Sequence, residues 1–440
     1  MRNGGLPYSD QKCYRWSELS RKFRRTALTS AEFGHRFGDV VLTVLDGEGR
    51  PLDDRDVVVE QRAHAFAFGN IGFDLVAVAN GEAASPGLAD LWFGIFNTAT
   101  LPFYWGLFEP ERGRPDTNRL RRAAQWFTDH GCRVKGHPLL WHTLAPDWLR
   151  DLPTDDVEAE VRARIRREVA GLADVVRTWD AINEAVIMPV FRNEPHRNAI
   201  TRLAWERGRI ATVRLAFEEA RAANPAATLV LNDFDMSSAY ECLVEGVLEA
   251  GIRIDALGLQ SHMHQGYWGE ERTLAVLDRF SRYGLPIHMT ETTLVSGHLM
   301  PADIEDLNDY QIPSWPSTPA GEERQADEIV RHYRTLLSHS SVQAITYWGL
   351  TDADAWLGAP CGLVRADGTP KPAYEALREL VRERWWLPPT NLRTDEAGRV
   401  TVRGFPGDYR VDCAGRTASF TIAVPGEAET SVRLERQSAR

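Results

Sequence analysis

Two glutamates, Glu184 and Glu291, each end an apolar run and have amide or imidazole groups nearby in the sequence. Cleavage of a glycosidic bond requires two carboxyl groups. One is protonated and releases the leaving oxygen, and the other is ionised and attacks the sugar or activates water. Indole rings, which are frequent around these runs, offer flat apolar faces to a pyranose. The pair of glutamates therefore indicates chemistry on sugars.

Polar residues with related chemistry follow six of the apolar runs. They occur in the segments GHPLLWH, WDAINE, NDF, QSHMH, MTETT and YWGLTD, which begin at residues 136, 179, 232, 260, 289 and 347. Carboxylates, imidazoles, amides and indoles dominate these segments. No glycine-rich phosphate loop of the GxGxxG or Walker type follows any run, so the sequence does not support a nucleotide site.

The apolar runs alternate with stretches of helical period. The runs cover residues 66–70, 93–98, 133–140, 176–183, 228–233, 256–262, 287–290 and 344–349. The helical stretches cover residues 118–130, 156–170, 200–223, 238–250, 272–283, 322–338 and 373–383, with a poor helix over 73–91. Strands joined by helical crossovers pair in parallel. Eight such units predict the α/β class and an eightfold β/α (TIM) barrel, whose active site gathers at the C-terminal strand ends.

The two ends of the chain have a different pattern. VVLTVLDGEGRPL, from Val40, predicts a β-hairpin, and residues 57–61 a further strand. After WWLPP, the pieces VTVRGF, YRVDC, ASFTIAV and TSVRL predict a small antiparallel β-domain. We divide the chain into an N-terminal extension with the hairpin (1–62), a catalytic barrel (63–386) and a C-terminal β-domain (390–436). The sequence leaves open the roles of residues 1–35 and of the C-terminal β-domain.

The charge balance restricts the classes of partner. The 440 residues include 51 basic and 62 acidic side chains, for a net charge of −11. This excess argues against nucleic acid or an anionic membrane as partner, and no apolar run approaches the ~18–20 residues of a membrane span. The five cysteines are scattered, as is typical of reduced thiols. Because the first 25 residues lack a signal-peptide pattern, we expect a cytoplasmic protein, or a secreted one if a leader was trimmed.

The motifs, in their order along the chain, resemble those of glycoside hydrolase family 10. This is the family of β-1,4-xylanases and related β-glycosidases. The motifs are GHPLLWHTLAPDWL, WDAINEAV, LNDFD, GLQSHMH, MTET, and YWGLTDADAW followed by TPKPAYEAL, and the resemblance spans residues 64–380. It implies a retaining glycosidase without metal or organic cofactor, acting on xylo-oligosaccharides, xylan or related small β-glycosides.

The resemblance also implies roles for individual residues. The family's acid/base glutamate corresponds to Glu184 and its nucleophile to Glu291. Retention of configuration implies carboxyl groups about 5–5.5 Å apart and a covalent glycosyl-enzyme intermediate. The residues that would bind substrate or support the carboxylates are His137, Trp141, Asn183, Gln260, His262, Trp348, Trp356 and Trp105.

The chain departs from the family pattern in two places. Xylanases carry a segment close to E-N-x-M-K-W on the second strand, where this chain has TLPFYWG, with Leu101, Pro102 and Tyr104 at positions expected to be polar. The family often reads E-L-D at the nucleophile, where this chain has Thr293 in place of the aspartate. The first change predicts a weaker distal glycone subsite. We therefore expect oligosaccharides or small β-glycosides as substrates in preference to intact xylan.

Two other classes of function remain open. The pair His262 and His264, with His288 as a third candidate, could be ligands of a metal-dependent barrel hydrolase. A barrel that binds carbohydrate without catalysis is the second alternative. Insensitivity of the activity to chelators would argue against the metal hypothesis. The oligomeric state is not predicted.

Overall fold

The computed structural model describes residues 33–83, 86–194, 196–353 and 355–436. The chain is divided into two compact units. One is formed by residues 66–377, and the other combines the segment that ends at residue 65 with the segment that begins at residue 378. The sequence left the role of residues 1–35 open, and residues 1–32 lie outside the described part of the chain. None of the described helices has the length and apolar content that crossing a membrane requires.

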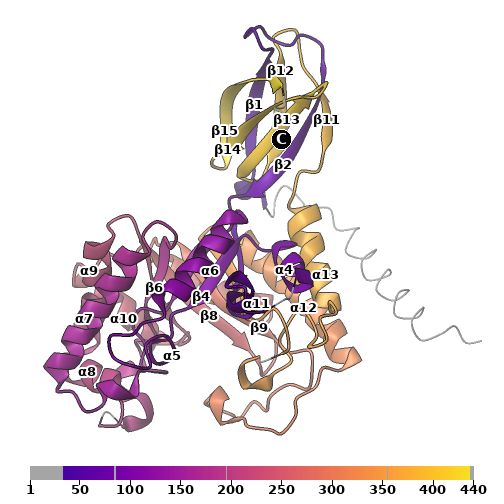
Figure 1. The fold of residues 1–440 in the computed structure, drawn as a ribbon. Helices are drawn as coiled ribbons and strands as arrows, with labels where there is room; N and C mark the ends of the chain where they lie inside the picture. Colours follow the sequence, from indigo (N-terminus) through magenta and orange to yellow (C-terminus); the bar gives the residue numbers. More distant parts are fainter. Residues whose placement is uncertain (1–32, 84–85, 195, 354, 437–440) are drawn as a thin grey trace, which may run out of the picture. The chain divides into compact units, whose positions relative to one another are not determined.

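The first unit is a closed barrel of eight strands, as predicted (Figure 1). Around the barrel the strands follow the order β10-β3-β4-β5-β6-β7-β8-β9, and every neighbouring pair is parallel. The strands are β3 (Ala67–Ile71), β4 (Thr98–Pro102), β5 (Arg133–His137), β6 (Thr178–Asn183), β7 (Thr228–Asp233), β8 (Ala256–Met263), β9 (Ile287–Leu294) and β10 (Val342–Tyr347). Parallel strands bring their C-terminal ends, and the polar residues found there, to one rim.

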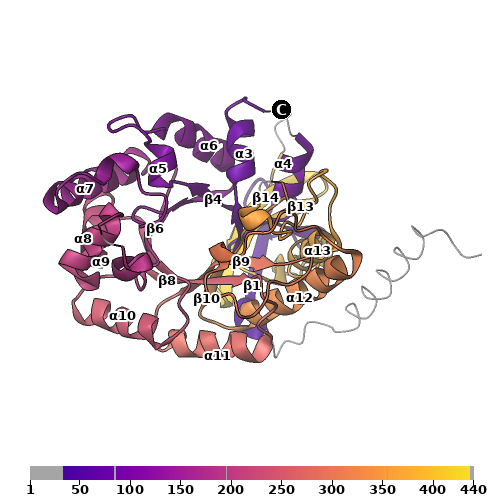
Figure 2. The same cartoon turned by 90° about the horizontal axis from the view of Figure 1, so that it is seen from below.

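Helices lie around the outside of these strands, as Figure 2 shows for α6, α7, α10 and α11. The helices are α3 (Phe73–Ala79), α4 (Pro86–Phe93), α5 (Trp105–Phe108), α6 (Thr117–Asp129), α7 (Thr154–Gly171), α8 (Ala199–Arg207), α9 (Arg209–Ala223), α10 (Ser238–Glu249), α11 (Glu270–Ser281), α12 (Pro319–Ser338) and α13 (Pro372–Glu379). The predicted helix over 200–223 is divided into α8 and α9 at Gly208, whose φ of +84° glycine adopts without strain.

One predicted strand lies elsewhere than expected. The sequence analysis placed the second strand at 93–98, but Phe93 ends helix α4 and the strand is β4. The ring of Phe93 packs 5.2 Å from that of Trp92 and 5.9 Å from that of Phe127, centroid to centroid. A short apolar run is compatible with a buried helix end as well as with a strand. The hydrophobic pattern alone could not distinguish the two.

The second unit consists of two β-sheets with one apolar core between them. One sheet has the order β12-β1-β15 and the other β11-β2-β13-β14-β16. Their strands are β1 (Gly38–Leu45), β2 (Asp56–His64), β11 (Thr390–Arg393), β12 (Arg399–Gly404), β13 (Gly407–Cys413), β14 (Arg416–Ile422), β15 (Gly426–Arg433) and β16 (Glu435–Arg436). The strands that we had assigned to two separate regions, 1–62 and 390–436, thus belong to one unit. We had ended the barrel at residue 386, whereas in the structure the barrel unit ends at residue 377.

The predicted N-terminal hairpin is replaced by pairing between the two ends of the chain. The turn after β1 forms, with Asp46 N donating to Arg50 O at 2.8 Å, but beyond it only a single bridge joins Leu45 and Pro51. Strand β1 instead pairs antiparallel with β12 and parallel with β15, while β2 pairs with β11 and β13. The alternating pattern of β1 buries one face in either arrangement, so the local sequence could not identify its partner.

Candidate active site

The two glutamates lie in the C-terminal half of one barrel strand and directly after another. Glu291 belongs to β9 and is only 4% exposed, and Glu184 directly follows β6. The backbone of Glu184 has a φ of +57°, a strained conformation for a residue with a side chain. It is held by Glu184 N, which donates to Asn232 O at 2.8 Å, and by Val186 N, which donates to Asp233 Oδ2 at 3.0 Å.

A chain of amide groups connects the two carboxylates. Asn183 Nδ2 donates to Glu184 Oε1 at 3.2 Å, and Asn232 Nδ2 lies 2.7 Å from Asn183 Oδ1 and 2.8 Å from Glu291 Oε1. Gln260 Nε2 donates to the same Asn183 oxygen at 3.1 Å. Asn232 was absent from our predicted site, although its place at the end of the fifth run was the signal that could have revealed it.

His262 contacts the Glu291 carboxylate on the side opposite the amides. Its Nε2 lies 3.1 Å from Glu291 Oε2, and its Nδ1 lies 3.4 Å from the hydroxyl of Thr293. That hydroxyl also accepts a hydrogen bond from Met263 N at 3.1 Å. A neutral hydroxyl therefore faces the second ring nitrogen, at the residue where the family often has an aspartate.

His137 belongs to a buried charged cluster that the sequence analysis did not identify. Its Nδ1 lies 2.7 Å from Asp180 Oδ2, and the same oxygen is 2.8 Å from Nζ of Lys135. All three side chains are nearly inaccessible to solvent. Asp180 lies in the segment WDAINE but was not among the predicted site residues, and Lys135 lies before the segments in which we looked for functional residues.

Three indoles named in the sequence analysis lie beside Glu184 or the histidines of the site. Each contacts a different polar side chain of the site. These contacts join Trp141 Nε1 to Glu184 Oε2 at 2.8 Å, the Trp348 ring to the His137 ring at 5.1 Å, and the Trp356 ring to the His262 ring at 4.9 Å.

Trp105 is the one predicted site residue that the structure does not bring to the carboxylates. It is 4% exposed, donates from Nε1 to Glu109 Oε2 at 3.0 Å and lies under the guanidinium of Arg164. Helix α5 begins at Trp105 and turns this side chain away. Tyr104 lies at the site instead, with its ring 5.6 Å from those of both His137 and Trp141.

The pKa values of the two carboxyl groups are shifted in opposite directions. Burial raises the pKa of Glu184 to about 8, and the charges of Glu291 and Asp233 add to this effect against the hydrogen bond from Trp141. Burial also acts to raise the pKa of Glu291, but the positive potential of His137 and the contact with His262 outweigh it and leave the pKa below its ordinary value. Near neutral pH one carboxyl is therefore protonated and the other ionised.

A sequence model described as "Glycosyl hydrolase family 10" matches residues 96–380, which is more than half of the chain. The chain belongs to glycosyl hydrolase family 10.

Individual relatives of this family member are distant. The anti-sigma-I factor RsgI6 of Acetivibrio thermocellus is 24% identical over 406 residues, which cover 90% of this chain and 46% of that protein. An endo-1,4-beta-xylanase/feruloyl esterase of Xylanibacter ruminicola is 28% identical over 302 residues, covering 60% of this chain and 39% of that protein. The chain thus spans less than half the length of both relatives.

Solved structures share the fold of this family 10 chain. Xylanase 10B from Thermotoga petrophila RKU-1, in complex with xylobiose, has a TM-score of 0.59 at 22% identity and covers 72% of this chain and 94% of its own. At this identity the comparison establishes the fold alone.

Among the described residues, no set of ligands supports the hypothesis of a metal site. Among those residues, no group of three or more His, Cys, Asp or Glu side chains is arranged to hold a metal ion. His262 contacts the Glu291 carboxylate, and His264 Nδ1 lies 3.4 Å from the Thr293 hydroxyl. His288 is half-buried, and desolvation together with the positive charge of Lys135 lowers its pKa to about 4.

Proposed function

We propose that this family 10 protein hydrolyses β-glycosidic bonds with net retention, Glu184 acting as acid and then base and Glu291 as nucleophile. The observation that carries the proposal is the opposite shift of the two pKa values at one strand rim. Titratable groups whose environments separate their pKa values commonly divide the acid and base roles between them. A protonated Glu184 and an ionised Glu291 are the states that the first step requires.

The reaction follows in two displacements. An oxygen of Glu291 attacks the anomeric carbon, the glycosidic C–O bond breaks, and the leaving oxygen takes the proton of Glu184. A water molecule then loses a proton to the Glu184 carboxylate and attacks the same carbon, which releases Glu291. The hydrogen bond from Trp141 Nε1 orients Glu184 toward the leaving group.

The amides and histidines have supporting roles in this proposal. Asn232 and His262 approach different oxygens of Glu291, so the carboxylate is fixed in one orientation before the sugar arrives. Such preorganisation lowers the entropic cost of reaching the transition state. Asn183 and Gln260 would hydrogen-bond the hydroxyl groups of the reacting sugar, while the indoles of Trp348 and Trp356 would pack on its faces.

The substrates that we propose are xylo-oligosaccharides and small β-glycosides. A xylanase with a similar fold is recorded in complex with xylobiose, which supports a xylose-based sugar. The side chain of Tyr104 and the fully buried Leu101 occupy the segment where xylanases hold the distal sugar through polar groups. Because these side chains stand in place of polar groups that would bind a distal sugar, they favour short glycones over an extended polysaccharide.

Alanine variants of the two glutamates test the roles through the stereochemistry of rescue. With sodium azide and an aryl β-xyloside, Glu291→Ala should give the α-glycosyl azide, because azide replaces the missing nucleophile. Glu184→Ala should give the β-glycosyl azide, because azide attacks the intermediate on Glu291. Near-normal hydrolysis by either variant, or the same anomer from both, would refute the assignment.

A substrate panel tests the specificity. Aryl β-xylosides, β-glucosides, β-cellobiosides and xylo-oligosaccharides should be hydrolysed faster than insoluble xylan, as measured by chromatography of the products. Abundant long products from insoluble xylan would contradict the proposed preference for small substrates.

Carbohydrate binding without turnover is the second candidate function. The alignment with the anti-sigma-I factor covers 90% of this chain, whereas that with the xylanase/feruloyl esterase covers 60%. The relative that matches over the greater length is therefore not named for an enzyme activity. Saturable binding of xylobiose in calorimetry, together with no hydrolysis of any glycoside in the panel, would favour this candidate.

A further inference from the structure

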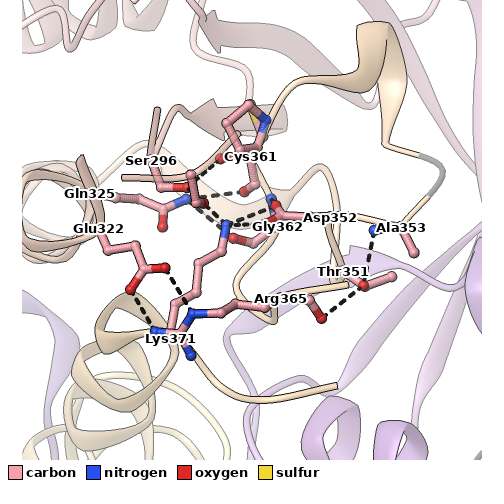
Figure 3. A network of polar contacts seen from close by, with 12 residues as sticks. Ser296, Glu322, Gln325, Thr351, Asp352, Ala353, Cys361, Gly362, Arg365 and Lys371 are labelled. Carbon is pink, nitrogen blue, oxygen red and sulfur yellow. Dashed lines mark hydrogen bonds and ion pairs between the residues drawn. The ribbon is translucent and has the colours of Figure 1, made fainter. Parts of the chain in front are cut away.

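A fully buried lysine, Lys371, lies in the TPKPAYEAL motif, which the proposed mechanism does not use. Figure 3 shows its ammonium group at the centre of a polar network. Nζ donates to Ser296 Oγ at 2.9 Å and to Asp352 Oδ1 at 2.7 Å. Burying a charged ammonium is costly unless partners are held close to it. The position of Lys371 therefore constrains the two groups that bind it.

Asp352 closes the base of the loop that follows β10. Its Oδ1 also accepts a hydrogen bond from Gly362 N at 2.9 Å, and its backbone N donates to Val364 O at 3.0 Å. Asp352 and Gly362 thus meet at one carboxylate, and the described residues 355–361 belong to the loop between them. The ammonium group of Lys371 binds this carboxylate and so holds the base of the loop in place.

Ser296, which follows β9, joins the same loop from the other side. Both Ser296 N, at 2.9 Å, and Ser296 Oγ, at 2.7 Å, donate to Pro360 O. A serine beside a lysine is also found in hydrolases that use serine as nucleophile. Here both side chains are inaccessible to solvent, and Asp352 holds the ammonium. The contact is therefore structural.

The loop presents Trp356 to the candidate active site. The Trp356 side chain is 38% exposed, and its ring lies 4.9 Å from that of His262 and 5.1 Å from that of His264. The next residue, Leu357, has a φ of +63° and packs on a small apolar cluster. A strained turn persists only where surrounding contacts determine it. The base of the loop supplies such contacts.

We infer that Lys371 is a positioning residue that, through Asp352 and Ser296, holds Trp356 against His262 and so sets the affinity of the site for its sugar. The effect on sugar affinity rests on the proposed function, whereas the placement of Trp356 does not. One buried cation ties the end of β9, which carries Glu291, to the loop after β10. Loss of the cation should release the indole while leaving both glutamates in place.

The test uses the double variant Lys371→Met/Asp352→Asn, which removes both charges and leaves no unpaired charge in the interior. The matched control is Arg331→Met/Glu270→Gln, which removes an ion pair between α12 and α11 whose atoms are 2.7 Å apart. Circular dichroism should show that both variants are folded at the assay temperature. If the first is not folded, Lys371→Gln/Asp352→Asn, which also removes both charges but keeps a polar group at each position, takes its place in the same measurements.

The first readout is the accessibility of Trp356 to acrylamide, obtained as the difference in fluorescence quenching between each protein and its Trp356→Phe counterpart. We expect this difference to increase at least twofold in the Lys371 variant and to stay constant in the control. No change in the Lys371 variant would overturn the inference, whatever the protein does to sugars.

The second readout is a double-mutant cycle on KM for 4-nitrophenyl β-xyloside. The Lys371 variant should raise KM about tenfold with a much smaller change in kcat, about 1.4 kcal/mol of coupling by the standard conversion. The effect should disappear in a Trp356→Ala background, and the control should change KM less than twofold. An equal effect in both backgrounds would show a merely structural role and overturn the inference. Absence of turnover in the parent protein would instead refute the proposed function and leave the quenching result valid.

Discussion

The two units of the molecule bury very different side chains. In the second unit, which we call the β unit, one large hydrophobic cluster lies between the sheets and includes Val40 and Leu42 of β1 as well as Val432 and Leu434. The hydroxyl of Tyr409, a member of this cluster, donates to Phe405 O at 2.6 Å. The buried polar side chains of the unit, which include those of Gln61, His64 and Thr394, are not members of the cluster. The β unit is therefore stabilised by apolar burial, at about 25 cal/mol per Å² of apolar surface.

The barrel strands bury charges and amides at and below the rim that carries the candidate site. Lys135, Asp180, Asn232 and Glu291 are all nearly inaccessible. Burying an ionised group costs several kcal/mol unless its partners compensate, and a paired arrangement is often no better than an apolar one. Residues that reduce stability in this way are expected at functional sites. The difference indicates that the chemistry lies at the rim, while the β unit has the composition of a structural core.

The largest effect should follow from removing the proton of Glu184. Glu184→Gln should lower kcat/KM by about 10²–10⁴, the usual contribution of a general acid–base group. The loss should be greatest for substrates with poor leaving groups, because these need the proton most. Steady-state kinetics on a series of aryl β-xylosides measures this dependence. A uniform loss across the series would contradict the acid role.

Breaking the buried ion pair at the rim should have the next largest effect. Lys135→Met leaves the buried Asp180 with His137 as its remaining partner, and should lower the free energy of unfolding by about 3 kcal/mol. The double variant Lys135→Met/Asp180→Asn should recover much of this loss, because neither charge remains. Urea unfolding of both variants tests the contrast. Equal losses in the single and double variants would mean that the charge left on Asp180 in the single variant costs little.

A cavity in the core of the β unit should affect stability without affecting chemistry. Leu42→Ala should lower the stability of that unit by about 3 kcal/mol, as is typical when a buried leucine is truncated. Turnover of a small glycoside should remain at the parental level at temperatures where this unit is folded. Calorimetric melting combined with kinetics checks both statements. A large fall in kcat for the folded variant would assign the β unit a catalytic role that its core does not suggest.

The smallest expected effect is a shift of the pH profile. Catalysis needs Glu184 protonated, so kcat/KM should fall as the pH rises through about 8, the pKa of that group. The charge of Asp233 helps to raise this pKa, and Asp233→Asn should therefore move the alkaline limb to lower pH. The asparagine keeps an oxygen that can accept the hydrogen bond from Val186 N. Asp147→Asn, at an exposed position, is the matched control. If the alkaline limb of Asp233→Asn stays in place, the charge of Asp233 does not raise the pKa of Glu184.

Much of the barrel was predictable because its signals are local. Seven of the eight strands share at least four residues with the expected runs, whereas β4 shares only Thr98, since alternation of apolar runs and helical stretches reflects contacts between neighbouring segments. The exception, β4, follows an apolar helix end that has the composition of a strand. The partner of β1 was not predictable for another reason. It pairs with β12 and β15, more than 350 residues further along the chain, and no local pattern encodes such a pairing.

The site was predicted where a residue type and its place at a strand end agreed. Glu184, Asn183 and His262 satisfied both conditions and lie together. Trp105 satisfied only the first, and the start of helix α5 turns its indole toward Arg164. Asp180 was overlooked because it lies inside its strand, where a charged group is expected only if it is paired.

The sequence by itself determined the alternation of strands and helices and the presence of two carboxylates beside the ends of apolar runs. Only the tertiary structure decided that these carboxylates have opposite proton affinities and that the two ends of the chain build one core. The reason is physical. Helical and strand periods depend on residues a few positions apart. By contrast, burial, electrostatic potential and sheet pairing depend on residues that are distant in the chain and meet only when it folds.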